Sequence, residues 1–270
     1  MEPTAALASH WSIDQIGYER IDVERVRPRD DLFLLVCSAA FIESGSDTYT
    51  RNLIEYFAGD GEFGAWLQQR WEPEELQHGR ALRRYLQHVW TEFDWDAAYA
   101  GFFAEYAQLC VIDELEPTRG QELVARCIVE TGTTTYYQAL GALAAQADEP
   151  VLRDLASRIR TDEVGHYKHF YHQFLKYRER EGLGRAQVVA AIWRRVAELR
   201  RSDSDIALRH AARALGGNAD AIRRHLHAQL AQGYPVELAV RMALKPLRLR
   251  AGLQRCAERP LGAVMRRLMH

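Results

Sequence analysis

The chain has 270 residues, of which 47% are hydrophobic and 27% charged, and its formal net charge is −2. This length is sufficient to bury a large core, and the nearly balanced charge gives the chain as a whole no special affinity for nucleic acid. No apolar run approaches the roughly 18 residues of a membrane span, no export signal opens the chain, and the four cysteines form no Cys-x-x-Cys pair, so we expect a cytoplasmic protein with reduced thiols.

The first two predicted helices form a hairpin. The first begins at the paired aspartates of residues 30–31 and ends at about residue 58, where the Gly-Asp-Gly of residues 59–61 stops it. The second covers about residues 64–90, with an amphipathic pattern and a kink or restart at Pro73.

Two further long helices follow. The third spans about residues 117–146, with a proline in its first turn, and the fourth spans about residues 148–182 or 148–184. Between the hairpins, residues 91–116 are long enough to cross from one to the other, and the run at residues 97–103 predicts an additional packed helix. Two hairpins joined by one long crossover are typical of a ferritin-like four-helix bundle.

After the fourth helix the chain changes character. Helical stretches near residues 185–200, 205–215 and 219–231 lead to a basic tail, which is predicted to be amphipathic helix interrupted at Pro246. An acidic carrier protein, an anionic membrane surface or a neighbouring subunit would each fit such a tail, and a solvated basic face is the simplest alternative. We predict one all-α domain over residues 1–270, with a core bundle at about 30–182 and a helical C-terminal annex at about 185–270.

The most informative feature is a duplicated Glu-x-x-His motif, found at Glu75–His78 and at Glu163–His166. A lone glutamate precedes each copy at a matching distance: Glu43 lies 32 residues before the first copy, and Glu130 lies 33 residues before the second. Residues i and i+3 share one face of a helix, so each motif directs a carboxylate and an imidazole towards one point. One such motif occurs by chance on many helices, whereas two copies with matched offsets indicate a built site.

Four carboxylates and two imidazoles are the ligand set of a di-iron or di-manganese centre in a ferritin-like bundle. Two divalent cations would also offset the cost of burying the carboxylates, which is several kcal/mol each even after relaxation. Iron or manganese suits this donor set better than zinc, whose structural sites prefer thiolates. The predicted metal ligands are Glu43, Glu75, His78, Glu130, Glu163 and His166.

The segments around these ligands follow a longer pattern. Residues 30–49 carry Asp-Asp-Leu-Phe, a ligand glutamate and Thr-Tyr, and Trp71–Gly79 reads Trp-x-x-Glu-Glu-x-x-His-Gly. Glu130–Thr133 reads Glu-x-x-Thr, and Asp162–His166 reads Asp-Glu-x-x-His. Over about residues 30–180 the chain therefore resembles the soluble acyl-acyl-carrier-protein desaturases. It departs from them inside the two Glu-x-x-His motifs, where the family usually has Asn-Arg and Lys-Arg and this chain has Leu-Gln and Val-Gly.

The resemblance implies a dioxygen-activating non-haem di-iron oxidase that abstracts hydrogen from a hydrophobic acyl or similar substrate. Its cofactor would be two Fe ions (Fe²⁺/Fe³⁺), with Mn as an alternative for one or both. The implied partners are an acyl carrier protein and a second copy of the chain in a homodimer. Because the chain shows no flavin or ferredoxin motif, the electrons would come from an external ferredoxin-like protein or flavoprotein.

Three further residues receive roles. The resemblance gives Thr133, one turn after Glu130, a catalytic part in handling the proton needed for dioxygen cleavage; the structural alternative is a hydroxyl bonded to its own i−4 carbonyl. Asp162 would accept a hydrogen bond from a ligand imidazole and fix its tautomer. Trp71, one turn before Glu75, would continue this series of hydrogen-bonded groups towards the surface as an electron route. The alternative is that Trp71 is an ordinary core tryptophan.

Two other functions remain open at this stage. A di-metal N-oxygenase or oxidase of a small amine or aromatic substrate would use the same centre, with His169 as a candidate seventh ligand. Iron storage would use the bundle alone and leaves the annex unexplained. A radical-generating reductase is disfavoured, because the positions one turn after the motif histidines hold Leu82 and Phe170 rather than tyrosine.

Overall fold

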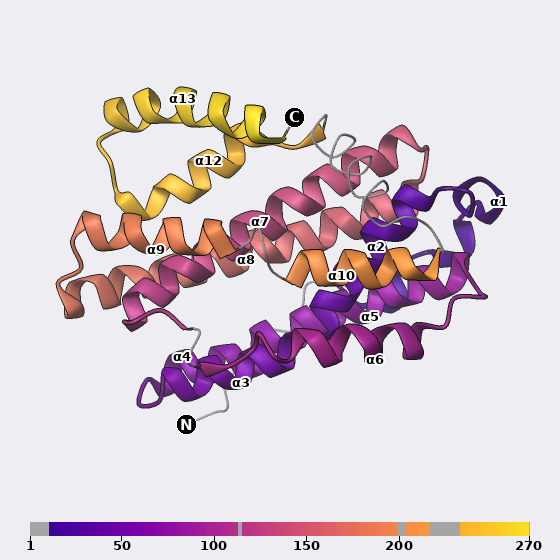
Figure 1. Ribbon diagram of the computed structural model, residues 1–270, viewed down its shortest axis with the longest axis horizontal. Coiled ribbons are helices and arrows are strands. Elements are labelled where there is room, and N and C mark those ends of the chain that lie inside the picture. Colours follow the sequence, from indigo (N-terminus) through magenta and orange to yellow (C-terminus); the bar gives the residue numbers. More distant parts are fainter. Residues whose placement is uncertain (1–10, 113–114, 199–202, 216–232, 270) are drawn as a thin grey trace. The chain divides into compact units, whose positions relative to one another are not determined.

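The computed structural model describes residues 11–112, 115–198, 203–215 and 233–269. Within these ranges the regular structure is entirely helical, which confirms the predicted all-α class (Figure 1). None of the described helices is long and apolar enough to cross a membrane. The described residues form two compact units, the first made of residues 11–112, 115 and 203–215 and the second of residues 116–198 and 233–269. The organisation as one domain with a core bundle at 30–182 stays a prediction.

The first unit is built around two antiparallel helices, α2 (Asp30–Ser44) and α5 (Glu72–Val89). Their opposite directions follow from Trp90, at the end of α5, whose indole N–H donates to the carbonyl of Arg27, just before α2, at 3.0 Å. α2 is apolar all round because α10 packs against it as well as α5. The other elements of this unit are α1 (Val23–Val26), α3 (Ser46–Tyr56), α4 (Gly61–Trp66), a π-helical turn (Leu67–Trp71), α6 (Trp95–Tyr106), α10 (Asp203–Ala214), and 3₁₀ turns at Ile13–Gln15 and Tyr18–Arg20.

The predicted continuous helix over residues 30–58 is wrong, because Gly45 divides it into α2 and α3. The cause is a contact with α6, the additional helix that was expected in the crossover. Tyr99 of α6 donates its hydroxyl to the carbonyl of Ser44 at 2.9 Å, so this carbonyl gains a partner outside the helix at the point where the helix breaks. The break places Glu43 in the last turn of α2.

The predicted second helix begins a little early, at Gly61, and passes through the π-helical turn Leu67–Trp71 before α5. Pro73 explains this turn, since it has no N–H to donate to the carbonyl four residues before it and its ring crowds that carbonyl. The helix widens instead, and the N–H of Glu72 bonds the carbonyl of Leu67, five residues back. The kink expected at Pro73 is therefore a widened turn just before the first Glu-x-x-His motif.

The second unit is built around α7 (Arg119–Gln146) and α8 (Pro150–Glu181), which pack along each other as an antiparallel hairpin. The connection between them is short because Glu149 caps α8. Its carboxylate accepts two backbone N–H groups in the first turn, at 2.8 and 3.2 Å. The predicted start of α7 at Pro117 is wrong, since Thr118 is the capping residue and its hydroxyl accepts an N–H of the first turn at 3.3 Å.

The annex is helical, as predicted. In the second unit its elements are α9 (Arg185–Glu198), α12 (Val236–Leu244), a 3₁₀ turn (Lys245–Leu247) and α13 (Ala251–Met269). The interruption expected at Pro246 is this 3₁₀ turn, which ends at Arg248 in the left-handed conformation (φ 50°). The helix predicted over residues 219–231 lies outside the described residues.

Two glycines, one just after the first Glu-x-x-His motif and one inside the second, give a matched test of packing. A Cβ at Gly79 on α5 would lie 2.8 Å from the backbone nitrogen of Ser44, whereas a Cβ at Gly165 on α8 would meet nothing within 4 Å. Gly79→Ala should lower the free energy of unfolding by about 1–2 kcal/mol, because overpacking outweighs the gain in helix propensity. Gly165→Ala should raise it by up to about 1 kcal/mol. Chemical denaturation measures both changes, and equal values would contradict the close approach of α5 to α2.

Candidate metal centre

The first unit brings together three of the six predicted ligands. Glu43 comes from the last turn of α2, and Glu75 and His78 come from successive turns of α5. All three side chains are buried, and His78 is fully inaccessible. Each offers one ligand atom within 4.8 Å of the others, and the Nδ1 of His78 lies 3.7 Å from the Oε2 of Glu43. We call this group the first triad.

The second unit repeats the arrangement. Glu130 projects from α7, and Glu163 and His166 project from α8, where they are one turn apart. These side chains are also buried, and their ligand atoms again lie within 4.8 Å of one another. The Nδ1 of His166 is 3.7 Å from Glu130 Oε2 and 3.9 Å from Glu163 Oε2. We call this group the second triad.

The distances within each triad suit ligands that share one metal ion. Two atoms that each lie about 2.1 Å from an ion are about 3 Å apart at 90° and about 4.2 Å apart at 180°. The imidazole–carboxylate distances of 3.7–3.9 Å fall in this interval and exceed the length of a normal N–H···O hydrogen bond. The donors are oxygen and imidazole nitrogen without a thiolate, which fits iron or manganese. Each triad can therefore hold a divalent cation.

Other buried glutamates of the described chain are compensated in a different way. Glu74, next to the first triad, lies 3.3 Å from Arg70, and Glu122 on α7 lies 3.0 Å from Arg126. In these pairs a guanidinium, which cannot bind a metal, balances the acid. In each triad the group at this distance is an imidazole, which is itself a metal ligand. The choice of base therefore separates structural ion pairs from candidate ligands.

The hydroxyl of Thr133 contacts a predicted ligand. It donates to Oε2 of Glu163 at 2.6 Å and makes a longer contact of 3.3 Å with the carbonyl of Glu130. The alternative expected for such a threonine, a bond to its own i−4 carbonyl, is found at its neighbours: Thr131 and Thr135 each make that bond at 2.7 Å. Thr133 is thus the threonine of this run that holds the carboxylate of a predicted ligand.

Tyr234, just before α12, is bonded to the same stretch of α7, and no sequence motif predicted this contact. Its hydroxyl lies 2.7 Å from Oγ1 of Thr135. Because Thr135 uses its one hydroxyl hydrogen on the carbonyl of Thr131, Tyr234 must be the donor. Burial raises the pKa of the Tyr234 hydroxyl, which keeps this proton in place. The bond joins the annex to the part of α7 that carries Glu130.

Asp162 and Trp71 are both buried, Asp162 on α8 beside Glu163 and Trp71 in the π-helical turn. Their roles in a proton and electron route stay predictions. The aromatic ring that the structure stacks on a ligand imidazole belongs to Trp11: its plane is 2° from that of His78, with centroids 6.2 Å apart.

Sequence reasoning missed Trp11 because it lies in an irregular segment that no helical period relates to His78. A further bond secures it there, since Nε2 of Gln77 donates to the Trp11 carbonyl at 3.2 Å. Gln77 is one of the positions where the chain departs from the usual desaturase pattern. At this position the chain thus carries a side chain that hydrogen-bonds the segment around Trp11 to the first Glu-x-x-His motif.

His169 does not join the second triad. The clustered donor groups of the described chain include His166 and not His169, whose Nε2 lies 3.2 Å from the side-chain nitrogen of Gln173. The seventh ligand considered for an amine-oxidising centre thus has no support from this geometry.

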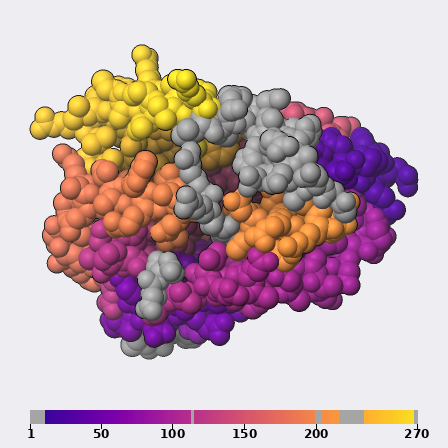
Figure 2. All heavy atoms as spheres, in the orientation of Figure 1, coloured from indigo at the N-terminus to yellow at the C-terminus, as the bar shows by residue number. Residues whose placement is uncertain are grey.

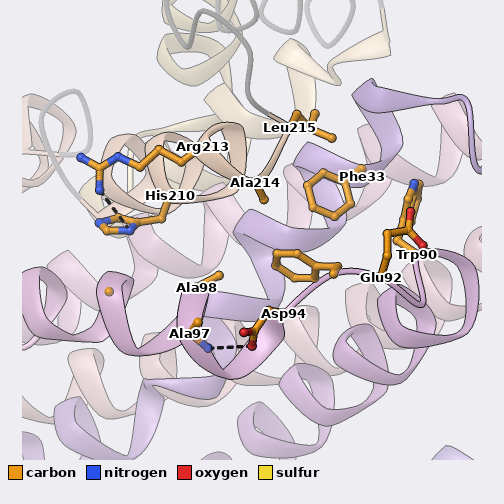
Figure 3. A pocket seen from close by; sticks show the side chains of 12 residues that line it. Phe33, Trp90, Glu92, Asp94, Ala97, Ala98, His210, Arg213, Ala214 and Leu215 are labelled. Atoms are coloured by element: carbon orange, nitrogen blue, oxygen red, sulfur yellow. Dashed lines mark hydrogen bonds between the residues drawn. The ribbon is translucent and has the colours of Figure 1, made fainter.

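A cavity of about 560 Å³ lies in the first unit (Figure 3). Aromatic rings, including those of Phe33 and Trp90, form part of its wall, and His210 and Arg213 of α10 contribute polar groups. His210 is held by Glu105, with its Nε2 2.9 Å from a carboxylate oxygen. None of the six predicted ligands is among the lining residues, so this cavity is not evidence for the shape of a substrate site.

No family model matches the chain. Two curated relatives, each named "Putative acyl-[acyl-carrier-protein] desaturase DesA2", come from Mycobacterium tuberculosis strains CDC 1551 / Oshkosh and ATCC 25618 / H37Rv. Each is 29% identical to the chain over 176 residues, which are 58% of this chain and 53% of the relative. The chain therefore spans about half the length of the curated relatives it matches. The likeness supports the desaturase resemblance at the level of an oxidoreductase.

The Tyr234 bond can be tested by removing one oxygen atom. Tyr234→Phe should lower the free energy of unfolding by about 1 kcal/mol, because it deletes a half-buried hydrogen bond and leaves the ring in place. Tyr171→Phe is the matched control, since the described contacts of Tyr171 with Lys245 and Tyr167 are made by its ring, and it should change stability by less than about 0.5 kcal/mol. Urea denaturation of both variants measures these changes. A Tyr234→Phe variant with the same free energy of unfolding as the wild type would contradict the bond.

Proposed function

We propose that the two triads meet around a pair of metal ions and that the protein is a dioxygen-activating di-iron oxidase. The observation that carries the proposal is the duplicated set of two buried carboxylates and one buried imidazole, built in the same way on each helix pair. Four carboxylates and two divalent cations are neutral together, which removes most of the cost of burying the acids. The likeness to proteins named as desaturases supports the same class of chemistry.

The substrate that we propose is a hydrophobic acyl chain or a similar group, presented by an acyl carrier protein. The support is the printed name of the relatives together with the resemblance of the ligand segments. When bound, a di-iron centre supplies the oxidising power that removes hydrogen from an unactivated carbon. Electrons would come from an external ferredoxin-like protein or flavoprotein, and a homodimer is the proposed assembly. Desaturation and hydroxylation share the hydrogen-abstraction step, so the ligands do not distinguish them.

Several residues of this chain would support the centre. Thr133 holds one carboxylate oxygen of Glu163 and carries a hydroxyl proton beside the second triad. The indole ring of Trp11 lies parallel to the imidazole of His78. Asp162 and Trp71 are proposed, as in the desaturase resemblance, to lie on a route for protons and electrons.

An N-oxygenase or oxidase of a small amine or aromatic substrate is the alternative within the same metal chemistry. The His169 geometry gives it no specific support. Iron storage would use the same ligands, and the metal and turnover measurements below distinguish it from an oxidase.

The metal site is tested first by composition. Protein prepared with added iron should contain about two metal ions per chain, as expected for a carboxylate bundle site. His78→Ala combined with His166→Ala should abolish metal binding, because each triad loses its imidazole. The matched control is His88→Ala with His172→Ala, which removes exposed histidines from the same two helices and should leave the metal content unchanged. Elemental analysis, with circular dichroism to confirm folding, gives the answer.

Equal metal contents in the two double variants would contradict the assignment of the ligands. A wild-type protein that carries no iron or manganese under these conditions would contradict the proposed centre. Finding instead one zinc ion per chain, which disappears when cysteines are replaced, would contradict it too.

Thr133 is tested in the chemical step. Thr133→Val should lower the rate of substrate-dependent dioxygen consumption by about 10–100-fold, the usual effect of losing a hydrogen bond to a metal ligand, with the iron content nearly unchanged. Thr133→Ser keeps the hydroxyl and should restore most of the rate. The measurement is a single turnover of the reduced, iron-loaded protein with an acyl-carrier-protein substrate.

Equal rates and product yields for wild type and Thr133→Val at equal iron content would show that Thr133 is structural. Rapid iron oxidation that ends in a mineral core at high iron loading, without substrate oxidation, would assign the protein to iron storage.

A further inference from the structure

The C-terminal part of the second unit has a positive net charge, whereas the rest of the chain has a negative one. Residues 236–269, which we call the basic tail, contain eight arginines and lysines against two glutamates, a net charge of +6. The whole chain carries −2, so the remaining residues carry −8. All eight basic side chains of the tail are exposed. A cationic surface of this kind on an acidic protein attracts an anionic partner.

Helix α13 presents this charge beside an uncovered apolar surface. Apart from the small residues Ala251, Gly252 and Ala263, its exposed apolar residues fall within an arc of about 140° at the α-helical 100° per residue. Leu253 is 59% exposed, Leu261 44% and Val264 54%. The segment that contains them forms part of the molecular surface, in yellow in Figure 2. We call this surface the apolar stripe. It consists of Leu253, Cys256, Pro260, Leu261 and Val264.

The other two sides of α13 have separate roles. Its inner side packs on α12, where Gly262 lies against Val236 and is buried. Arg255, Arg259 and Arg266 project from a third side, within about 40° of one another around the axis. Arg266 is also paired with Glu237 of α12, so α13 is anchored to α12 by charge as well as by packing. The helix thus has one anchored side, one apolar side and one basic side, and the exposed Arg267 lies within the arc of the apolar stripe rather than on the basic side.

The chemistry of these sides favours lipid over a protein partner. Protein interfaces concentrate their binding energy in aromatic anchors that fill pockets, and the described α13 contains no tryptophan, tyrosine or phenylalanine. Its apolar stripe instead offers aliphatic side chains of moderate size. The neighbouring arginines have long side chains that can reach the phosphates of lipid headgroups. An amphipathic helix with a basic side and a short aliphatic side is suited to the boundary between lipid headgroups and acyl chains.

We propose that α13 binds the surface of an anionic membrane, with the apolar stripe in contact with acyl chains and the arginine side bound to lipid phosphates. The helix lies parallel to the membrane plane and does not cross it. This inference does not depend on the proposed oxidase, because it uses no metal ligand and no substrate.

Vesicle binding tests the proposal on the full-length wild-type chain. Sedimentation with phosphatidylcholine vesicles that contain about 30% phosphatidylglycerol should show binding at least tenfold tighter than with pure phosphatidylcholine, since each basic residue near such a surface adds roughly fivefold. Raising the salt should weaken binding, because the Debye length falls from about 8 Å at 0.15 M to about 3 Å at 1 M.

Paired variants locate the contact. Arg255→Glu with Arg259→Glu should weaken binding at least tenfold, whereas Arg153→Glu with Arg185→Glu, an identical charge change at exposed positions on α8 and α9, should have a much smaller effect. Leu261→Ser with Val264→Ser should weaken binding several-fold. Its control is Leu109→Ser with Val111→Ser, which removes exposed apolar side chains from the first unit and should leave binding unchanged.

Cys256 provides a direct reporter. The structure describes all four cysteines, and Cys256 is exposed whereas Cys37, Cys110 and Cys127 are buried. An environment-sensitive fluorophore on Cys256 should shift to the blue on addition of anionic vesicles, because this position lies on the apolar stripe. The same fluorophore in the variant Cys256→Ser with Lys176→Cys, an exposed position on α8, should not shift.

Binding that is equal for neutral and anionic vesicles would overturn the proposal, as would binding without a spectral shift at Cys256 or equal losses in test and control variants. A spectral shift with an acidic acyl carrier protein and none with vesicles would assign the surface to a protein partner instead. Because the metal content is measured separately, failure of this inference leaves the proposed oxidase untouched, and the reverse also holds.

Discussion

A carboxylate buried among packed helices needs a compensating charge or hydrogen-bond donors, since an isolated ion costs several kcal/mol even after the protein relaxes. This protein uses two solutions within a few residues of each other. Glu74 is balanced by Arg70, and the next residue, Glu75, lies in a triad with an imidazole. A guanidinium forms an ion pair and cannot bind a metal. An imidazole beside two carboxylates is itself a metal ligand, so the group can bind a divalent cation.

The two triads have the same donors but different surroundings. The first triad lies between irregular features: α2 ends just after Glu43, the π-helical turn precedes α5, and the ring of Trp11 lies parallel to that of His78. The second triad lies on two long, regular helices and is held by a hydroxyl, that of Thr133, on Glu163. Two ions bound by equal ligands would therefore experience unequal support.

The extent to which the sequence predicted this structure depends on how far apart the interacting residues lie. The grouping of Glu75 with His78, and of Glu163 with His166, follows from helical spacing alone, which is local. The break at Gly45 depends on a bond from Tyr99 to Ser44 across 55 residues, and no local pattern reveals it. The same holds for Trp11 on His78 and for Tyr234 on Thr135. For Thr133, spacing predicted the metal-facing side, but its partner Glu163, 30 residues away, required the structure.

We propose that the two triads share one pair of metal ions, and anomalous X-ray diffraction can locate these ions. Data are recorded on both sides of the metal absorption edge from crystals of the iron- or manganese-loaded protein. Two anomalous peaks about 3.5–4 Å apart are expected, the usual separation in two-metal sites, with Glu43, Glu75 and His78 around one and Glu130, Glu163 and His166 around the other. A single peak, or two peaks separated by much more than this distance, would contradict this proposal.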